Sequence, residues 1–200
     1  MWFEPKIVFE VVLLILFLNQ SSAIKYRFNF ENEGVFSDCA NEPRSVKNME
    51  GLADLSEMTF KYNMEFVALS GNITYIWDIQ PGDRVQCDIQ VFRFDRGSWL
   101  PTILSLSIAD MCSKLYDESQ YWYKSWTKNI INIDEIKDKC VYPGTKAIHK
   151  SFDLDIVIEI SGLPWRGLHK MIFRFKAFDS KNVIRPTSIC FAIVGEIERM

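Results

Sequence analysis

The residues able to perform acid–base or nucleophilic chemistry are few in this chain, and their spacing matches no catalytic motif. His149 and His169 are the two histidines. Neither belongs to a His-Glu-x-x-His pair, and no Gly-x-Ser-x-Gly turn presents a nucleophile. Asp153 and Asp155 resemble a carboxylate pair, but they alternate with apolar residues and so fit the solvated face of a strand. The histidines fit ordinary polar positions at strand ends, and we expect a protein that is not an enzyme.

The cysteines are the second chemically capable group, and they occur at Cys39, Cys87, Cys112, Cys140 and Cys190. No Cys-x-x-Cys pair is present and the spacings are wide, so we expect no zinc, no other metal and no cofactor. Cys87 lies in an alternating, strand-like run, where a single thiol packs as a small buried hydrophobe. The other four allow three pairings. Of these we favour Cys112–Cys140, which closes an aromatic segment, and Cys39–Cys190, which ties an early segment to the last strand.

The first residues predict export from the cell. A short region with one lysine precedes the apolar run 7–18, which is interrupted only by Glu10, and Ser21-Ser22-Ala23 offers small residues for cleavage. The run is shorter than the roughly 20 residues of a membrane span. We therefore expect a cleaved signal peptide at 1–23, with an uncleaved signal anchor as the alternative. Residues 24–200 are then one secreted, extracellular domain.

Charge and composition narrow the class of partner. The formal net charge is −3, and removal of a segment that carries Glu4, Lys6 and Glu10 leaves it near −2. This argues against nucleic acid, because phosphate binding requires clustered lysine and arginine. Aromatic residues make up 14% of the chain, including six tryptophans, and such side chains provide large apolar contact areas. Asn72-Ile73-Thr74 is a glycosylation sequon, which we expect on an exposed turn.

The stretch from Cys112 to Cys140 concentrates aromatic residues between two cysteines. Five rings fall within eleven positions of it: Tyr116, Tyr121, Trp122, Tyr123 and Trp126. One interpretation is a tethered lid or contact surface for something apolar. The other is that these rings cap the end of a packed core, and spacing alone does not decide between them.

Alternation of apolar and polar residues predicts an all-β fold. Strands are expected at 26–30, 58–68, 73–79, 85–94, 152–160, 171–177 and 189–197, with a turn at 70–72, a loop over 31–56 and a short helix within 103–115. These elements predict two antiparallel sheets in an open sandwich, or β-cup, with an aromatic entrance segment bracketed by a disulfide.

Large apolar side chains are more numerous than a sandwich of this size needs. On the predicted strand faces they are Phe60, Tyr62, Met64, Phe66, Trp77, Phe92, Phe94, Phe173, Phe175 and Phe191. If the sheets splay apart, these side chains line a concave pocket that suits an acyl or hydrocarbon chain. If the sheets close, the same side chains interdigitate as a dry core about 10 Å thick.

Several short motifs resemble a known family. They are Asp110-Met111-Cys112, the aromatic stretch ending in Cys140-x-Tyr142-Pro143-Gly144, the Leu163-Pro164-x-x-Gly167 turn and Cys190-Phe191. Over roughly 26–197 the chain resembles the insect CheA/CheB chemosensory proteins, and more distantly the ganglioside-activator and MD-2-related lipid-recognition families.

The resemblance implies a secreted β-cup around a hydrophobic cavity, with an entrance loop held by disulfides. It implies the pairings Cys39–Cys190 and Cys112–Cys140, at the positions that match the ganglioside activators. The chain lacks the further entrance-loop cysteines of those activators. The insect branch implies a role in gustatory or pheromone detection.

Two functional hypotheses follow. The first is a secreted, non-enzymatic binder of an apolar small molecule or lipid, such as a hydrocarbon pheromone. In it, the strand faces hold the chain and Tyr121, Trp122, Tyr123 and Trp126 lie at the mouth, at the apolar–water boundary. The second is an extracellular interaction module with a filled core. That module uses the aromatic segment and Trp165 as hot spots against a receptor, channel or membrane surface.

Overall fold

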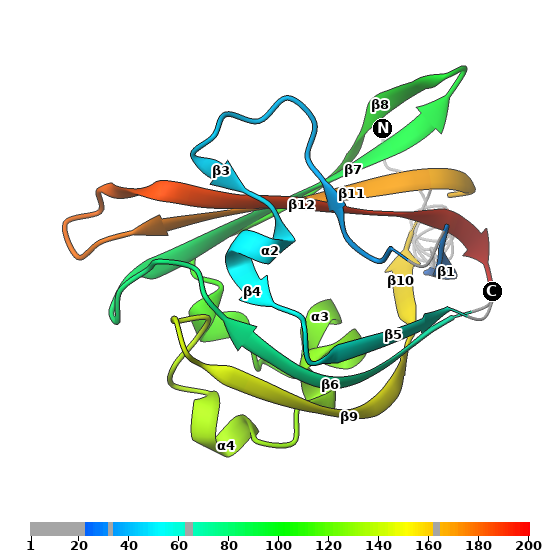
Figure 1. The fold of residues 1–200 in the computed structure, drawn as a ribbon. Helices are drawn as coiled ribbons and strands as arrows, with labels where there is room; N and C mark the ends of the chain where they lie inside the picture. The colour runs from blue at the N-terminus through cyan, green and yellow to red at the C-terminus, as the bar shows by residue number, and fades with distance from the viewer. Residues whose placement is uncertain (1–22, 32–33, 63–65, 162–164) are drawn as a thin grey trace, which may run out of the picture.

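The computed structural model describes residues 23–31, 34–62, 66–161 and 165–200. Apart from Ala23, the predicted signal peptide lies outside these residues, as do Met64 and positions 162–164 of a predicted turn. The described chain is mostly β, in two antiparallel sheets with a few short helices, and this confirms the predicted fold class (Figure 1). None of the helices in these ranges combines the length and apolar character that crossing a bilayer requires.

The larger sheet is a curled half-barrel with the strand order β10-β1-β12-β11-β7-β8. Its strands are β1 (Ile24–Phe30), β7 (Arg84–Asp95), β8 (Ser98–Ile108), β10 (Ile156–Ile160), β11 (Gly167–Phe178) and β12 (Ile184–Arg199). Two short strands, β2 (Ser37–Asp38) and β3 (Val46–Lys47), also pair with β12, and the β3 pairing is parallel.

Alternation along β11 defines the inner face of the larger sheet. Phe173 lies opposite Ile89 of β7 and Phe191 of β12, so these three side chains share one face. Lys170 and Arg174 project from the opposite face, because successive residues of a strand point to opposite sides. The inner face is therefore apolar and the outer face is basic along β11.

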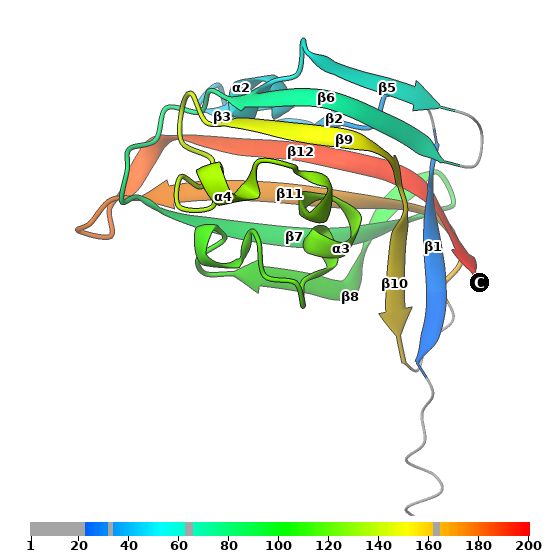
Figure 2. The same ribbon diagram turned by 90° about the horizontal axis from the view of Figure 1, so that it is seen from below.

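The smaller sheet faces this apolar surface. It contains β4 (Ala53–Asp54), β5 (Met58–Tyr62), β6 (Val67–Tyr75) and β9 (Lys146–Leu154), and β6 pairs with each of the other three. Only Asp155 separates β9 from β10, which pairs with β1 in the larger sheet. Figure 2 shows β9 running directly into β10, so one stretch of chain joins the two sheets along one side.

The predicted turn at 70–72 is wrong, because β6 runs through these positions. Gly71 has φ +116°, and the pairing register with β9 shifts between Leu69 and Gly71. A β-carbon on Gly71 would lie 2.1 Å from the Glu57 carbonyl oxygen. The glycine therefore marks a bulge where another backbone approaches closely.

The predicted helix within 103–115 is also wrong over most of its length. Residues up to Ile108 belong to β8, and only the 3₁₀ turn η1 (Cys112–Lys114) is helical. Leu104, Leu106 and Ile108 are spaced two apart with serines between them, and a run this short fits either period. Pro101 is accommodated because β8 lies at the end of the sheet order, where one edge needs no partner.

Two connections cover the flanks of the sandwich. The region 31–56, predicted as loop, contains β2, β3, the one-turn helix α2 (Met49–Leu52) and β4. The aromatic segment between β8 and β9 forms η1, α3 (Tyr121–Ser125), η2 (Thr127–Asn129) and α4 (Ile133–Ile136). Ile131 donates a backbone hydrogen bond to the Ile148 carbonyl (2.8 Å), so this segment lies along β9 (Figure 2).

Candidate functional site

Aromatic rings from both sheets meet in the space between them. On the larger sheet, Phe173 and Phe175 stack on Phe191, with ring centroids 5.1 and 5.9 Å apart. Phe36, in the connection before β2, lies 5.3 Å from Phe191 and 6.2 Å from Phe60 of the smaller sheet. The rings therefore form a continuous apolar surface that reaches from one sheet to the other.

Trp126 brings the aromatic segment into this interior. Its ring lies 6.3 Å from Phe36, 5.9 Å from Phe152 and 5.3 Å from His149. The residue caps the end of α3, whose last turn closes through a hydrogen bond from the Trp126 N–H to the Trp122 carbonyl. The segment thus contributes an inner wall as well as an outer surface. We call Phe36, Phe60, Trp126, His149, Phe152, Phe173, Phe175 and Phe191 the ring cluster.

His149 is the polar member of the ring cluster. It is 4% exposed, and neither ring nitrogen has a hydrogen-bond partner among the described residues. Burial between the Trp126 and Phe152 rings lowers the pKa of His149 to about 4. The imidazole is therefore neutral at pH 7, with one nitrogen able to donate and the other able to accept.

Sequence reasoning missed this site because His149 resembles an ordinary polar residue in a strand. Phe36 and Phe152 were missed as well. Phe36 belongs to an isolated apolar pair in a polar region, and Phe152 lies beside a bulged part of β9. The one sequence feature that could have indicated a buried role for Phe36 is its pairing with Val35 in an otherwise polar region.

Several inner-face rings keep part of their surface accessible. Phe36, Phe60, Trp126, Phe152, Phe173 and Phe175 pack against the core yet are only partly buried. At one end of the sandwich, Trp77, Val85 and Ile189 are buried almost completely. The interior is therefore closed at that end and less tightly closed around the ring cluster.

Six of the eleven predicted ligand-binding residues pack against the core and are partly buried. They come from the two sheets and the aromatic segment and are Phe60, Tyr62, Trp122, Trp126, Phe173 and Phe175. The Tyr62 hydroxyl also donates to the Phe30 carbonyl (3.2 Å). Phe66 is partly buried immediately before β6.

The predicted inward placement of Phe92 and Phe94 is wrong. Phe92 stands beside Lys170 on the outer face, with the ammonium 5.8 Å from the ring centroid. Phe94 packs against Trp99 (5.1 Å between centroids) and is 42% exposed. Because β7 is apolar on both faces, alternation did not identify the inner face, and the register with β11 does.

Trp77 is also not a lining residue. It is 1% exposed, and its indole N–H donates to the Thr187 hydroxyl (3.2 Å). Its side chain belongs to the solid core at the closed end of the sandwich.

The outer part of the aromatic segment presents a polar surface. Tyr121 is 48% exposed, with the Lys124 ammonium 5.8 Å from its ring centroid. Trp122 and Tyr123 are partly buried; the Trp122 indole donates to the Lys114 carbonyl (2.9 Å) and the Tyr123 hydroxyl to Glu118 (3.3 Å). Of the rings predicted at a mouth, Tyr121 is therefore the one that is well exposed.

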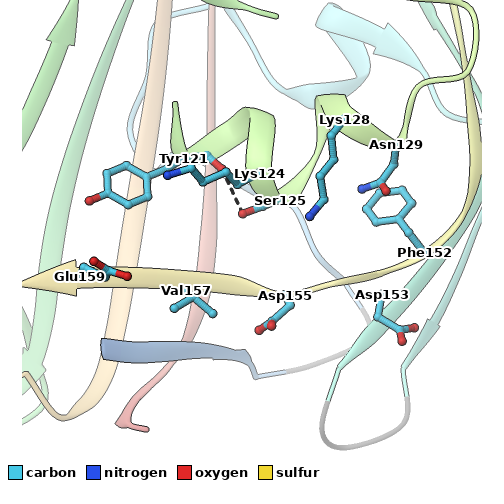
Figure 3. Close-up of a pocket in the computed structure, with 10 residues that line it drawn as sticks. All are labelled: Tyr121, Lys124, Ser125, Lys128, Asn129, Phe152, Asp153, Asp155, Val157 and Glu159. Carbon is cyan, nitrogen blue, oxygen red and sulfur yellow. Dashed lines mark hydrogen bonds between the residues drawn. The ribbon is translucent and has the colours of Figure 1, made fainter. Parts of the chain in front are cut away.

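A pocket of about 420 Å³ lies between this segment and the β9–β10 strand (Figure 3). One wall comes from α3 and η2, with Tyr121, Lys124, Ser125, Lys128 and Asn129. The other comes from β9 and β10, with Phe152, Asp153, Asp155, Val157 and Glu159. Phe152 belongs to both the pocket and the ring cluster.

Two carboxylates of the pocket are paired with β1. Asp155 accepts from Arg27 (2.9 Å), and Glu159 pairs with Lys25 (3.3 Å). Within the described residues neither Lys128 nor Asp153 forms an ion pair. The pocket thus holds an unpaired cation on one wall and an unpaired anion on the other.

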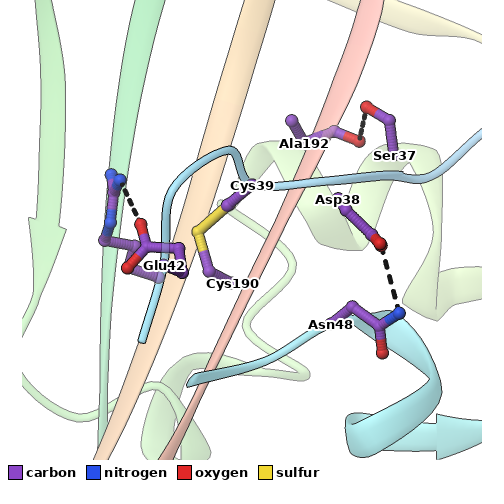
Figure 4. The surroundings of a disulfide bond; sticks show 8 residues. Ser37, Asp38, Cys39, Glu42, Asn48, Cys190 and Ala192 are labelled. Atoms are coloured by element: carbon purple, nitrogen blue, oxygen red, sulfur yellow. Dashed lines mark hydrogen bonds and ion pairs between the residues drawn. A yellow bond between two sulfur atoms is a disulfide. The ribbon is translucent and has the colours of Figure 1, made fainter. Parts of the chain in front are cut away.

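Both predicted disulfides are present. Cys112–Cys140 and Cys39–Cys190 have Cα–Cα distances of 5.1 and 5.8 Å. Glu42 approaches the second disulfide and pairs with Arg174 at 2.9 Å (Figure 4). Because the Cys39 and Cys190 sulfur atoms are bonded to each other, they are not thiolate ligands for a metal.

Cys87 is a free, buried thiol, as predicted from its strand position. Burial raises its pKa to about 12, so at pH 7 it is almost entirely in the unreactive thiol form.

Three further sequence expectations are corrected. Asn72 lies within β6 rather than on a turn, and its amide donates to Glu57 (2.7 Å). Trp165 is 6% exposed and packs 5.5 Å from His169, so it is not a surface hot spot. His169 is 1% exposed and contacts the Gly167 carbonyl through Nδ1 (2.7 Å), so both histidines are buried residues.

Comparison with protein-family models gives no match, and comparison with curated proteins gives none either.

Proposed function

We propose that this protein is a secreted, non-enzymatic binder of an apolar ligand, a lipid or a hydrocarbon pheromone. The observation that carries the proposal is the ring cluster, whose rings face inward from two sheets and a tethered segment yet stay partly accessible. Buried apolar surface that is not fully packed favours an apolar guest, because each CH₂ removed from water contributes about 0.8 kcal/mol. Phe173, Phe175 and Phe191 form one side of such a site and Phe60 the other.

The proposed compartment and process have separate support. Two disulfides favour an oxidising, extracellular environment. The resemblance of the sequence to the CheA/CheB proteins supports a role in chemosensation. Absence of a recognisable catalytic motif in the sequence supports binding without turnover.

Tryptophan quenching by a long-chain fatty acid brominated on its tail tests the proposal. Trp126 lies in the ring cluster and Trp99 on the outer face, so bound ligand should quench Trp126 selectively. We expect saturable quenching in the wild type, most of which is lost in Trp126→Phe and retained in Trp99→Phe. Extraction of protein purified from insect cells should also recover an apolar compound.

Absence of both saturable quenching and copurified compound would refute the proposal. Quenching that disappears in Trp99→Phe rather than in Trp126→Phe would show that the ligand binds outside the sandwich.

The second candidate, an extracellular interaction module, is favoured by a different observation. The hairpin formed by β7 and β8 exposes Phe94, Leu100, Ile103 and Leu106, and Ile103 is 79% exposed. Exposed apolar side chains grouped on one hairpin suit a receptor contact. If this surface is the functional one, Ile103→Lys abolishes receptor activation and leaves ligand-dependent quenching unchanged.

A further inference from the structure

Two short helical turns form the cationic wall of the pocket. Tyr121, Lys124 and Ser125 come from α3, and Lys128 and Asn129 come from η2, with Trp126 in a non-helical conformation between the two turns. Figure 3 shows Lys128 and Ser125 projecting from this segment toward the β9–β10 strand. The Ser125 hydroxyl is occupied by the Tyr121 carbonyl (3.1 Å), so the two lysines supply the charge of this wall.

The opposite wall offers one carboxylate that remains without a counter-ion. Arg27 and Lys25 neutralise Asp155 and Glu159 from the neighbouring strand β1. Asp153 has no ionic partner in the part of the chain that the structure describes. An unpaired carboxylate that lines a pocket favours an amine or a quaternary ammonium group through attraction of opposite charges.

Phe152 connects this pocket to the interior. Its ring lines the pocket and lies 5.9 Å from Trp126 and 6.0 Å from His149 in the ring cluster. Val157 adds an apolar wall on the β10 side. A molecule with a charged head in the pocket therefore has an apolar surface next to it, leading toward the inner faces of the sheets.

We infer that this pocket binds a zwitterionic group of the phosphocholine or phosphoethanolamine type. Lys124 and Lys128 contact the phosphate, and Asp153 contacts the ammonium group. The pocket volume of about 420 Å³ lies within the range of small-molecule sites. The part of this inference that concerns an attached tail rests on the proposed function, whereas recognition of the charged group does not.

A series of compounds that share one twelve-carbon tail tests the inference. Dodecylphosphocholine, dodecyl phosphate and dodecyltrimethylammonium are titrated below their micelle-forming concentrations and dodecanol below its solubility limit, with binding measured by calorimetry. Free phosphocholine is titrated in parallel. We expect dodecylphosphocholine to bind about tenfold more tightly than each of the other three, because only it engages both walls.

Variants then assign the walls. Lys128→Ala should weaken dodecylphosphocholine and dodecyl phosphate by about fivefold to tenfold. Asp153→Asn should weaken dodecylphosphocholine and dodecyltrimethylammonium and leave dodecyl phosphate unaffected. Lys150→Ala is the matched control, because Lys150 is exposed on β9 and does not line the pocket. It should leave all four affinities unchanged.

The outcomes separate this inference from the proposed function. Equal affinity for dodecanol and dodecylphosphocholine, with no effect of Lys128→Ala or Asp153→Asn, overturns the zwitterion site while apolar binding stands. Binding of free phosphocholine as tight as that of dodecylphosphocholine supports the site for a free solute and counts against a lipid guest. Tight binding only of the tailed zwitterion supports a lipid headgroup, and no binding by any compound overturns both.

Discussion

His149 owes its chemistry to its surroundings in the ring cluster. The rings of Trp126 and Phe152 replace the water that would stabilise an imidazolium ion, and the backbone of Ala147 offsets only part of this loss. The consequence is a side chain that remains neutral well below pH 6.5. This property depends on residues distant in the sequence, which is why the strand pattern alone gave no indication of it.

The stability of the protein should therefore depend on His149 in mildly acidic solution. The folded-state pKa is about 4 and the reference pKa is 6.5. Above pH 6.5 both states are neutral at this residue; as the pH falls toward 4, the unfolded state takes up a proton first. We expect the free energy of unfolding to drop by about 3 kcal/mol over this window from His149 alone. Urea unfolding at pH 7, 5.5 and 4 measures it.

The comparison variant is His149→Phe, which keeps an apolar ring and removes the titration. Carboxylates contribute to the pH dependence of the unfolding free energy in both proteins. The difference between wild type and variant therefore gives the contribution of His149. An equal acid loss in the two proteins would show that His149 does not titrate as proposed.

Asp83 is a buried carboxylate that is bound by an arginine. Arg185 donates two hydrogen bonds to it, at 2.7 and 2.8 Å, and these hydrogen bonds lower the pKa of Asp83. Asp83→Asn removes the carboxylate that binds the guanidinium directly and leaves it only the charges of Asp78 and Asp179. We expect this substitution to destabilise the protein by about 3 kcal/mol, measured by urea unfolding at pH 7.

The surface pair Arg93–Asp95, at 3.4 Å, provides the control. Asp95→Asn should change the unfolding free energy by less than about 1 kcal/mol, because water screens exposed pairs. If the two substitutions cost the same, burial is not what makes the Asp83 pair strong.

At the scale of elements, the bulge in β6 depends on a glycine. Gly71→Ala combines a positive φ with a contact of 2.1 Å between the new β-carbon and the Glu57 carbonyl. We expect destabilisation of about 2 kcal/mol or more, since both β5 and β6 must move. Thermal melting of the purified variant measures it.

Gly82→Ala separates backbone strain from steric overlap. Gly82 also has a positive φ (+93°), but no atom lies within 4 Å of its added β-carbon. Its cost should be about 1 kcal/mol. If Gly71→Ala destabilises the protein no more than Gly82→Ala does, the Glu57 backbone does not approach Gly71 as closely as described.

Sequence patterns identified strands more reliably than their orientation. β1, β7 and β11 occur close to where alternation predicts them. The inner face of β7 was not predictable, because Val91 and Phe92 are both apolar and only the pairing with β11 distinguishes them. For β8 and the Gly71 region, local signals for a helix or a turn were overridden by pairing with neighbouring strands.

At the scale of the whole molecule, the two disulfides constrain different things. Cys39–Cys190 joins positions 151 residues apart, and Cys112–Cys140 joins positions 28 apart. Loop-closure entropy predicts a loss of about 5 kcal/mol when the first is removed and about 3.5 kcal/mol for the second. Cys39→Ala/Cys190→Ala should therefore show the lower urea midpoint.

Cys112→Ala/Cys140→Ala should act more locally. Hydrogen exchange should quicken across 112–140, while the strands of the larger sheet keep their protection. A uniform increase across both sheets would mean that this disulfide supports the whole fold rather than the aromatic segment.

Fold class was predictable because strand alternation is a property of the linear sequence. Cysteine number left three disulfide pairings open, and the segments that each pairing would join favoured the one that is present. The candidate site was only partly predictable. Phe173, Phe175 and Phe60 follow from alternation, whereas the contribution of Phe36 and the inward position of Trp126 depend on how two irregular connections fold back. The pocket beside β10 requires the same long-range arrangement.

The strand that bends at Asp155 has a mechanical consequence. β9 and β10 are consecutive in the chain but belong to different sheets. Residues 154–156 therefore join the two sheets covalently, and we call this connection the spine of the sandwich. Swelling to accommodate a bulky guest would then separate the two sheets more at margins away from the spine, while spacing at the spine stayed fixed. Spin labels placed across each margin would register this as unequal widening.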